Sequence, residues 1–361
     1  MSLVKLRAEL TAIDQQLIEL IAKRQQVVGK IGQNKLTTGR ATRDFEREKD
    51  VLELAREHAR ELSVNPDLAE SIMRSLIRSS LASQERERVV AEGKGEGRRV
   101  LVIGGAGKMG GWFVDFFSSQ GFVPVVADAA IQDGDGRFRD WHDAGVDFDV
   151  IVVATPLAIS GEVLLELAEL APRSLIFDIG SLKSPLRAGL HALRDAGCKI
   201  TSLHPMFGPD TDLLSGRHLI FVDVGCAEAT VMAREMFAAT MVEQLEMNLE
   251  DHDRLVAYVL GLSHALNIAF FTALAESGEA APRLAKLSST TFDSQLLVAS
   301  AVANENPYLY FEIQNLNEFG LDPLDALCES VTRIRKLVAD GDQQGFVKLM
   351  STGREYLATR R

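Results

Sequence analysis

The stretch VLVIGGAGKMGGWF, residues 100–113, decides the fold of the central part of this 361-residue chain. Four apolar residues typical of a buried strand lead into Gly105, Gly107 and Gly110, and a helical pattern continues to Gln120. Strand, glycine turn and helix in this order open a dinucleotide-binding α/β unit, in which the glycines let a pyrophosphate approach the helix N-terminus. A glycine-rich turn without a ligand is the alternative interpretation.

The residues around this turn predict which nucleotide binds. Lys108 and Met109 complete the loop, and Asp128 ends the next apolar run, VPVVAD, about 20 residues further on. A carboxylate at this place accepts hydrogen bonds from a ribose 2′-hydroxyl and repels a 2′-phosphate. No arginine follows before Arg137. We therefore predict NAD rather than NADP, with Thr155 at a later strand end as a further cofactor contact.

Composition excludes several classes of protein. The net charge of −12 argues against sequence-independent nucleic-acid binding, and 46% hydrophobic with 25% charged residues is typical of a globular protein. Cys198, Cys226 and Cys328 are widely spaced, which predicts reduced thiols and neither a disulfide nor a metal site. The N-terminus lacks the apolar core of a signal peptide, and no apolar run reaches about 18 residues. We expect a cytoplasmic protein without a membrane span.

The residue pattern divides the chain into a helical module at 1–90, a linker at 91–98, an α/β domain at 99–248 and a second helical domain at 249–361. The polar, glycine-rich stretch from Glu85 to Arg99 is typical of a flexible connection. The α/β domain is predicted to be a parallel sheet of Rossmann type. Its expected strands are VLVIGG, VPVVAD, VIVVATP, SLIFDIG, CKITSLH and HLIFVDV.

The first helix carries a heptad seam, which indicates a long helix packed along its length against a partner. The seam consists of Leu3, Leu6, Leu10, Ile13, Leu17, Leu20, Val27 and Ile31.

Cations interrupt this apolar pattern. Arg24 occupies a seam position and shares a helix face with Lys35, whereas Arg7 points about 100° away from Arg24. Cations placed in an apolar seam require anionic partners, because a buried charge without a partner is energetically costly. Pairing of Arg24 with Glu48 inside a helical dimer would satisfy this need. The excess of arginine and lysine over the nearby acids favours a bound dianion instead.

The motifs LRAELTAID, AKRQQVVGKIGQNK and RDFEREKDVLE resemble the all-helical chorismate mutases over residues 1 to about 90. The resemblance implies a site shared by two chains, with an arginine crossing from the partner, and a rearrangement in which no proton moves. Lys35 and Gln84 would serve the ether oxygen and Glu48 the ring hydroxyl. The other ligands that the resemblance implies are Arg7, Arg24, Asp44, Arg47 and Ser80.

A histidine is fixed at the end of a predicted strand in LHPMFGPD, residues 203–210. Pro205 and Pro209 favour extended backbone at the residues before them, so the loop holds His204 still. His204, Thr155 and Gly180 to Lys183 follow strand ends at one sheet edge, where ligands of such folds bind. With a pKa near that of a free histidine, His204 could accept a substrate proton. A rigid turn with a surface histidine is the alternative.

DIGSLKSP, LHPMFGPD and the C-terminal helices resemble prephenate dehydrogenase, so the whole chain resembles the fused chorismate mutase–prephenate dehydrogenases of tyrosine biosynthesis. The resemblance implies that His204 bonds the ring 4-hydroxyl, that Ser181 supports it, and that His252 and His264 lie near the substrate. It also implies a homodimer through the C-terminal helices. His252 in the charged LEDHDR could instead be solvated, and His264 merely packed. The N-terminal module could be a dimerising or regulatory addition to a monofunctional dehydrogenase.

One departure from the family bears on the substrate. The helix after LSS carries carboxylate-binding arginines in the family, but Asp293 and Ala301 stand there in this chain. Arg217, Arg254 or Arg283 could replace them. The alternative is a retuned pocket for the 4-amino-4-deoxy analogues of chorismate and prephenate, giving 4-aminophenylpyruvate.

Overall fold

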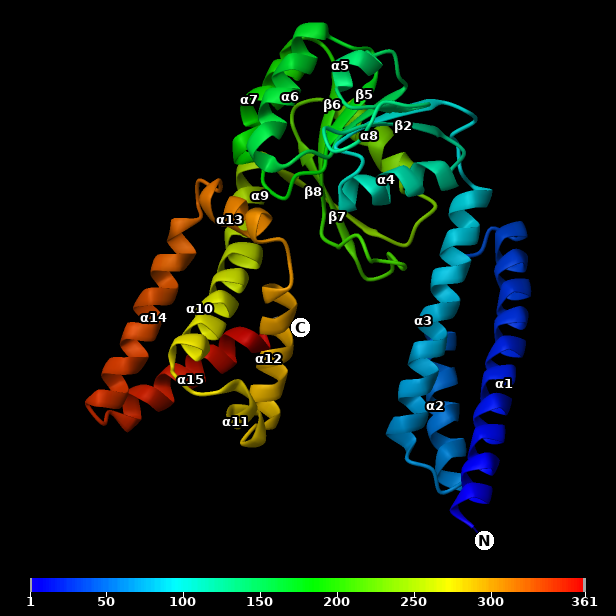
Figure 1. Cartoon of the computed structure of the whole chain (residues 1–361), viewed down its shortest axis with the longest axis vertical. Helices are drawn as coiled ribbons and strands as arrows, with labels where there is room; N and C mark the ends of the chain where they lie inside the picture. The colour runs from blue at the N-terminus through cyan, green and yellow to red at the C-terminus, as the bar shows by residue number, and fades with distance from the viewer. Residues whose placement is uncertain (1, 360–361) are drawn as a thin grey trace.

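The computed structural model describes residues 2–359 and has three parts in chain order (Figure 1). The first part is a bundle of three helices, each begun by a polar N-cap side chain that accepts a backbone N–H. The helices are α1 (Leu3–Thr37), α2 (Phe45–Glu61) and α3 (Pro66–Ala91). All eight residues of the α1 heptad seam are 46–62% exposed in the single chain. The apolar face of α1 is therefore uncovered.

The expectation of a flexible linker from Glu85 was wrong for residues 85–91, which continue α3. Glu85 is 4% exposed and accepts backbone N–H groups of Leu214, at 2.8 Å, and of Met241 in the central domain. The linker glycines pack closely: Gly95 N donates to Gln120 O at 2.9 Å, and a Cβ on Gly95 would lie 2.2 Å from Phe122 N. Here glycine permits close backbone approach rather than flexibility.

The central part is an eight-stranded sheet in the order β3-β2-β1-β4-β5-β6-β7-β8. Six of its strands are the six predicted ones. The strands are β1 (Arg99–Ile103), β2 (Val123–Ala127), β3 (Arg137–Phe138), β4 (Val150–Val153), β5 (Leu175–Asp178), β6 (Lys199–Pro205), β7 (His218–Asp223) and β8 (Glu243–Asn248).

The prediction of a wholly parallel sheet was wrong at β7, which runs antiparallel to β6. No helix lies between these two strands, so the chain has no crossover that would return it in the parallel direction. The sequence analysis also missed β3, which is two residues long, and β8, whose sequence EQLEMN is too polar to stand out.

Helices cover both faces of the sheet (Figure 1). Side chains of β1 alternate, so Val100 and Val102 join one core with Phe113 and Phe117, while Leu101 and Ile103 join the other. The first face is covered by α4 (Lys108–Ser119) and α8 (Ala227–Met236), and the second by α5 (Trp141–Ala144), α6 (Leu157–Leu170) and α7 (Arg187–Asp195).

The third part is helical, as predicted, and its apolar surfaces are widely exposed. Glu312 of this part contacts the central part, because its carboxylate accepts the backbone N–H groups of Leu157 and Ala158 at the N-terminus of α6. Its elements are α9 (Leu249–Val256), a π-helical segment (Ala257–Leu262), α10 (Ser263–Glu276), α11 (Ala281–Lys286), α12 (Thr290–Ala303), α13 (Pro307–Asn315), α14 (Leu321–Ala339) and α15 (Gln343–Ala358).

The helical stretch Leu249–Glu276 has the length and the mean hydropathy, 1.6, of a membrane span. The sequence analysis did not anticipate this, because short polar interruptions break the apolar run. Those interruptions are informative: His252 and Asp253 are fully buried and Asn267 is 4% exposed, each bonded within the chain. Only 22% of the most apolar 18-residue window of this stretch is buried within the single chain, so most of its apolar surface is uncovered.

Candidate active sites

The glycine turn between β1 and α4 has the shape that a dinucleotide requires. A Cβ on Gly110 would lie 2.2 Å from Gly104 O, and one on Gly107 would lie 3.2 Å from the same oxygen. No side chain caps the N-terminus of α4, so its first N–H groups can bind an anion, and Lys108 beside them is exposed. Gly104 has φ +86° and was overlooked in the motif. These residues fit a bound pyrophosphate.

The other predicted cofactor residues lie at the same sheet edge. Asp128 follows β2 and accepts the N–H of Ala106 in the glycine turn at 3.1 Å and that of Ala130 at 2.9 Å. Thr155 follows β4 and bonds Ser160 at 2.8 Å. Met109 is half-buried at the start of α4 beside the core of that face. The structure therefore brings the predicted loop and Asp128 together.

His204 lies on β6, one residue before the strand ends, and is 4% exposed. Its Nδ1 is 2.9 Å from Nε2 of His252, which is fully buried at the start of the C-terminal domain. His252 Nδ1 is 2.7 Å from Asp253 Oδ1. The prediction that LEDHDR could leave His252 in solvent was wrong, since one face of α9 packs against the sheet edge.

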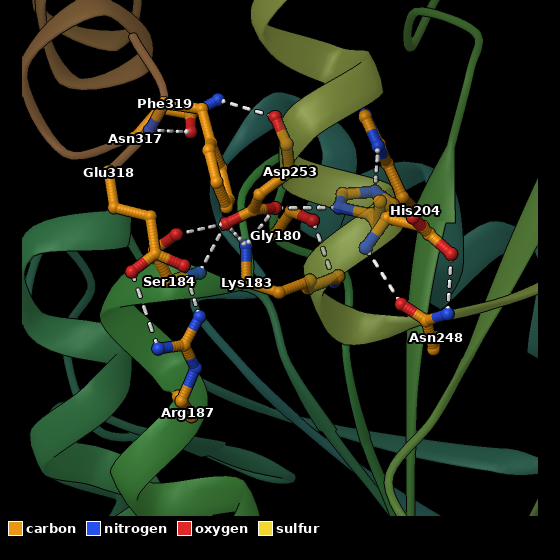
Figure 2. Close-up of polar contacts among 12 residues, drawn as sticks. Gly180, Lys183, Ser184, Arg187, His204, Asn248, Asp253, Asn317, Glu318 and Phe319 are labelled. Carbon is orange, nitrogen blue, oxygen red and sulfur yellow. Dashed lines mark hydrogen bonds and ion pairs between the residues drawn. The ribbon is translucent and has the colours of Figure 1, made fainter.

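Figure 2 shows that Asp253 is held from several sides. Its carboxylate accepts the backbone N–H of Lys183, at 2.8 and 3.0 Å, and both the N–H and the hydroxyl of Ser184. Asn317 Nδ2 donates to Asp253 O at 2.9 Å. Asp253 therefore joins the loop after β5, α9 and the segment after α13.

Lys183 closes the same loop from inside. Its fully buried ammonium donates to Asp178 Oδ1 at 2.6 Å, Gly180 O at 2.7 Å and Leu203 O at 2.8 Å. Burial lowers the pKa of Lys183, against the opposing effect of Asp178. The loop is thereby fastened to β6 next to His204.

The three buried groups His204, His252 and Asp253 have displaced pKa values. Burial lowers the pKa of His204 well below its ordinary value of 6.5, and His252 and Lys183 lower it further. Burial also lowers the pKa of His252, although Asp253 opposes this. Burial disfavours ionised Asp253, but hydrogen bonds from His252, Ser184 and Lys183 N outweigh it and lower its pKa. The expectation of a nearly unperturbed His204 was wrong because His204 is buried.

The protonation state of Asp253 determines the tautomers of His252 and His204. An ionised Asp253 only accepts, so His252 carries its proton on Nδ1 and presents a lone pair at Nε2. His204 must then carry its proton on Nδ1, which leaves its Nε2 unprotonated. The array therefore presents a neutral proton acceptor at the sheet edge.

Two predicted residues lie outside this array. Ser181 is half-buried, and its side chain makes no hydrogen bond among residues 2–359. The group that contacts His204 is His252. His264 on α10 stacks on Tyr310 of α13 with ring centroids 4.0 Å apart, and burial lowers its pKa. The sequence analysis placed Lys183 at this sheet edge but gave it no role. It missed Asp253, which adjoins His252, and Ser184, which lies within the quoted DIGSLKSP.

In the helical module, four predicted residues gather between α1 and α3. Arg24 donates to Ser80 Oγ at 2.7 Å and to Leu76 O at 3.2 Å, and burial lowers its pKa. Gln84 Nε2 donates to Val28 O at 3.3 Å, and Gln84 Oε1 is buried without a partner in the described chain. Gln84 and Lys35 line one small cavity. Lys35 donates to Thr42 O at 2.6 Å.

The other four predicted residues of the module do not join this group within one chain. Arg7 is exposed on α1, and Arg47 is exposed on α2. The backbone N–H of Arg47 donates to Oδ1 of the N-cap residue Asp44 at 3.0 Å. Glu48 pairs with Arg43 at 2.9 and 3.0 Å, so the alternative pairing of Arg24 with Glu48 does not occur in the single chain. The sequence analysis did not anticipate Arg43.

Comparison with known proteins gives a consistent result. Models of three families match: chorismate mutase type II at residues 6–85, the prephenate dehydrogenase nucleotide-binding domain at 126–235, and the prephenate dehydrogenase dimerization domain at 248–352. The T-protein of Enterobacter agglomerans is 27% identical over 96% of this chain and 90% of its own length.

Two further proteins are informative. The 4-amino-4-deoxyprephenate dehydrogenase of Streptomyces pristinaespiralis is 28% identical over 70% of this chain and 89% of its own length. The crystal structure of prephenate dehydrogenase from A. aeolicus with hydroxyphenyl propionate and NAD+ superposes with a TM-score of 0.57. It covers 73% of this chain and 98% of its own, at 18% identity, and so supports the fold. The chain therefore joins a type II chorismate mutase domain to the two domains of a prephenate dehydrogenase.

Proposed function

We propose that this bifunctional enzyme, a chorismate mutase fused to a prephenate dehydrogenase, rearranges chorismate to prephenate and oxidatively decarboxylates prephenate to 4-hydroxyphenylpyruvate. The observation that carries the second reaction is the buried array His204–His252–Asp253, which lies at the same sheet edge as the dinucleotide loop. The full-length match to a T-protein supports the pairing of both reactions in one chain.

In the dehydrogenase, His204 is the group that accepts the proton of the substrate 4-hydroxyl. Its Nε2 is unprotonated because Asp253 sets the tautomer of His252, and His252 sets that of His204. When His204 takes the proton, its Nδ1 proton can shift to His252, next to the carboxylate of Asp253. The positive charge is then stabilised in a buried place that would otherwise disfavour it. Ser181 and His264 are assigned to substrate contacts at the same edge.

For the cofactor we assign NAD. The family match supports a nicotinamide dinucleotide, which accepts a hydride when bound. Gly105, Gly107, Lys108, Met109, Gly110 and Thr155 would hold it, by their place at the carboxyl edge of the sheet. Asp128 is held by Ala106 and Ala130 N–H groups at the end of β2, where it would accept the ribose hydroxyls and repel a 2′-phosphate.

In the mutase, catalysis is charge stabilisation and positioning of a bound dicarboxylate. Lys35 and Gln84 serve the ether oxygen, and the unpartnered Gln84 Oε1 marks a polar site that a ligand can complete. Arg24 and Arg47, with Ser80 and Asp44, hold the carboxylates and the ring, and Glu48 the ring hydroxyl. Arg7 is too far round α1 to join them and reaches the site of a second chain.

We assign a homodimer, formed by the exposed seam of α1 and by the C-terminal helices. The cytoplasm is the proposed location, because the three cysteines are free and Cys328 is exposed. The domain limits are 1–90, 99–248 and 249–361.

A second candidate function concerns the substrate. The similarity to a 4-amino-4-deoxyprephenate dehydrogenase and the lack of arginine in α12 favour a 4-amino analogue. The suggested replacement cations are occupied or distant: Arg254 pairs with Asp251, Arg283 pairs with Glu279, and Arg217 faces the mutase helices. One observation opposes a 4-amino substrate. Arg43 neutralises the charge of Glu48 in the mutase, and a neutralised carboxylate suits a substrate hydroxyl better than a substrate ammonium group.

Steady-state kinetics on both substrate pairs tests the proposal. Chorismate and prephenate should be turned over with kcat/KM at least about tenfold above the 4-amino compounds, roughly the value of one charge-assisted contact. Near-inactivity on prephenate with rapid turnover of its amino analogue would select the second candidate. Removal of residues 1–90 should abolish the mutase reaction; unchanged mutase activity would contradict its assignment to that module.

A further inference from the structure

A cleft of about 250 Å³ lies where the mutase helices meet the dehydrogenase domain. One wall is formed by Arg43, α2 and α3, and the other is the turn at residues 213–217 that leads into β7. Apolar side chains line part of it: Leu52, Ile77, Leu81 and Leu213. Glu48, assigned to the mutase reaction, lies on its wall.

Four arginines line this cleft, although the protein carries a net charge of −12. Two of them are paired, Arg43 with Glu48 and Arg74 with Glu70. The side chains of Arg78 and Arg217 make no hydrogen bond or ion pair within residues 2–359. Two free guanidinium groups facing one cleft attract an anion.

The turn that carries Arg217 is held rigidly by the mutase module. Leu214 N donates to Glu85 Oε2 at 2.8 Å, and Arg43 donates to Ser215 Oγ at 2.8 Å. Gly216 has φ +74°, and Arg217 N donates to Leu214 O at 2.9 Å, which closes a type II turn. A dehydrogenase residue is thus placed against the mutase helices by contacts that the mutase module itself makes.

We propose that this cleft extends the binding site of the mutase substrate, in which Arg78 and Arg217 join the arginines assigned above in binding the carboxylates of the ring dicarboxylate beside Glu48. Guanidinium groups match the carboxylates, and the apolar residues match a six-membered hydrocarbon ring. The inference rests on the proposed mutase function. Its distinctive consequence is that a residue of the dehydrogenase domain sets the affinity of the mutase reaction.

The test measures kcat and KM of each reaction separately in Arg217→Ala and Arg78→Ala. Each single variant should raise the KM for chorismate about threefold to tenfold, and the double variant should raise it roughly tenfold to fiftyfold. The kcat should stay nearly unchanged, because the lost contact binds the substrate and the transition state equally. The KM for prephenate in the dehydrogenase reaction should stay the same. High salt should reduce the difference from wild type, because partly exposed charges are screened.

Two further variants serve as controls. Arg217→Lys keeps the charge and should recover most of the affinity for chorismate. Arg86→Ala removes an exposed arginine of α3, the helix that carries Arg78, at a position outside the cleft. It should change the kinetic constants of neither reaction. Thermal unfolding of all variants at the wild-type temperature shows that the fold is intact.

Several results would overturn the inference. A raised KM for prephenate in Arg217→Ala would assign this arginine to the dehydrogenase instead. Unchanged constants in both reactions, or a fall in mutase kcat at constant KM, would show that the cleft does not dock the substrate. If wild type does not convert chorismate, the proposed function fails and this inference fails with it. A different outcome is that wild type converts chorismate while Lys35→Ala does not. In that case an unchanged KM for chorismate in Arg217→Ala refutes the extension of the site into this cleft and leaves the proposed mutase function standing.

Discussion

The two catalytic regions differ in how much of each site one chain supplies. In the dehydrogenase, His204 is 4% exposed, and His252 and Asp253 are fully buried and bonded in series. In the mutase, Arg7, Asp44 and Arg47 are exposed, and a long apolar seam beside them is uncovered. One region is closed within a chain and the other is open.

The chemistry explains the contrast. Accepting a proton requires a base with a fixed tautomer and an unprotonated nitrogen, which burial and direct hydrogen bonds provide. A rearrangement without proton transfer requires charges arranged around a dianion, and exposed arginines from two chains can provide these on assembly. The following predictions test this difference, beginning with the largest effect.

Replacing His204 with Asn should lower dehydrogenase turnover by roughly 10²–10⁴ and leave the mutase reaction intact, because the proton acceptor serves one site only. Both reactions should be followed in the same preparation. Loss of both activities with the fold intact would contradict the separation of the sites.

Replacing Lys35 with Ala should have the opposite selectivity. We expect mutase turnover to fall by roughly 10²–10³, since the ammonium group stabilises charge at the ether oxygen. Prephenate oxidation should continue at the wild-type rate. A Lys35→Ala enzyme with normal mutase turnover would remove this residue from the site.

Replacing Asp253 with Asn should slow the dehydrogenase by roughly tenfold to a hundredfold, less than His204→Asn, because Asp253 acts through His252. The amide can also reverse the His252 tautomer, so the acid limb of the pH profile of kcat/KM should shift. A lower rate with an unchanged pH profile would show that Asp253 has only a structural role.

Replacing Asp128 with Ala should narrow the preference for NAD+ over NADP+ by about tenfold, because the carboxylate no longer repels a 2′-phosphate. The ratio of kcat/KM for the two cofactors is the measurement. Equal use of both by the wild type would show that Asp128 does not select the cofactor.

The buried histidines should also make stability depend on pH. The folded chain lowers the pKa of His204 and His252, whereas the unfolded chain protonates them near 6.5. The unfolded state then binds more protons below that pH, so the free energy of unfolding should decrease as the pH falls through 6.5. Denaturant unfolding of wild type and His204→Asn tests this, and the variant should show the smaller decrease.

The regular elements could be predicted from periodicity, because strands such as β1 and β4 are buried on both faces and read as continuous apolar runs. β8 could not, because an edge strand tolerates a polar sequence. The buried state of His252 and the packing of Glu85 also escaped prediction. Both charged stretches look solvated locally, and only contacts with distant residues such as Lys183 and Leu214 satisfy them.

The central claim is that the mutase site is shared between chains and the dehydrogenase site lies within one. Co-expression of two impaired variants of each site tests it directly. Arg7→Ala and Lys35→Ala chains should together regain about a quarter of wild-type mutase activity, because half of randomly paired dimers hold one intact site. His204→Asn and Asp253→Asn chains should regain no dehydrogenase activity beyond the sum of the separate variants. Absence of mutase recovery, or recovery of the dehydrogenase, would contradict the account.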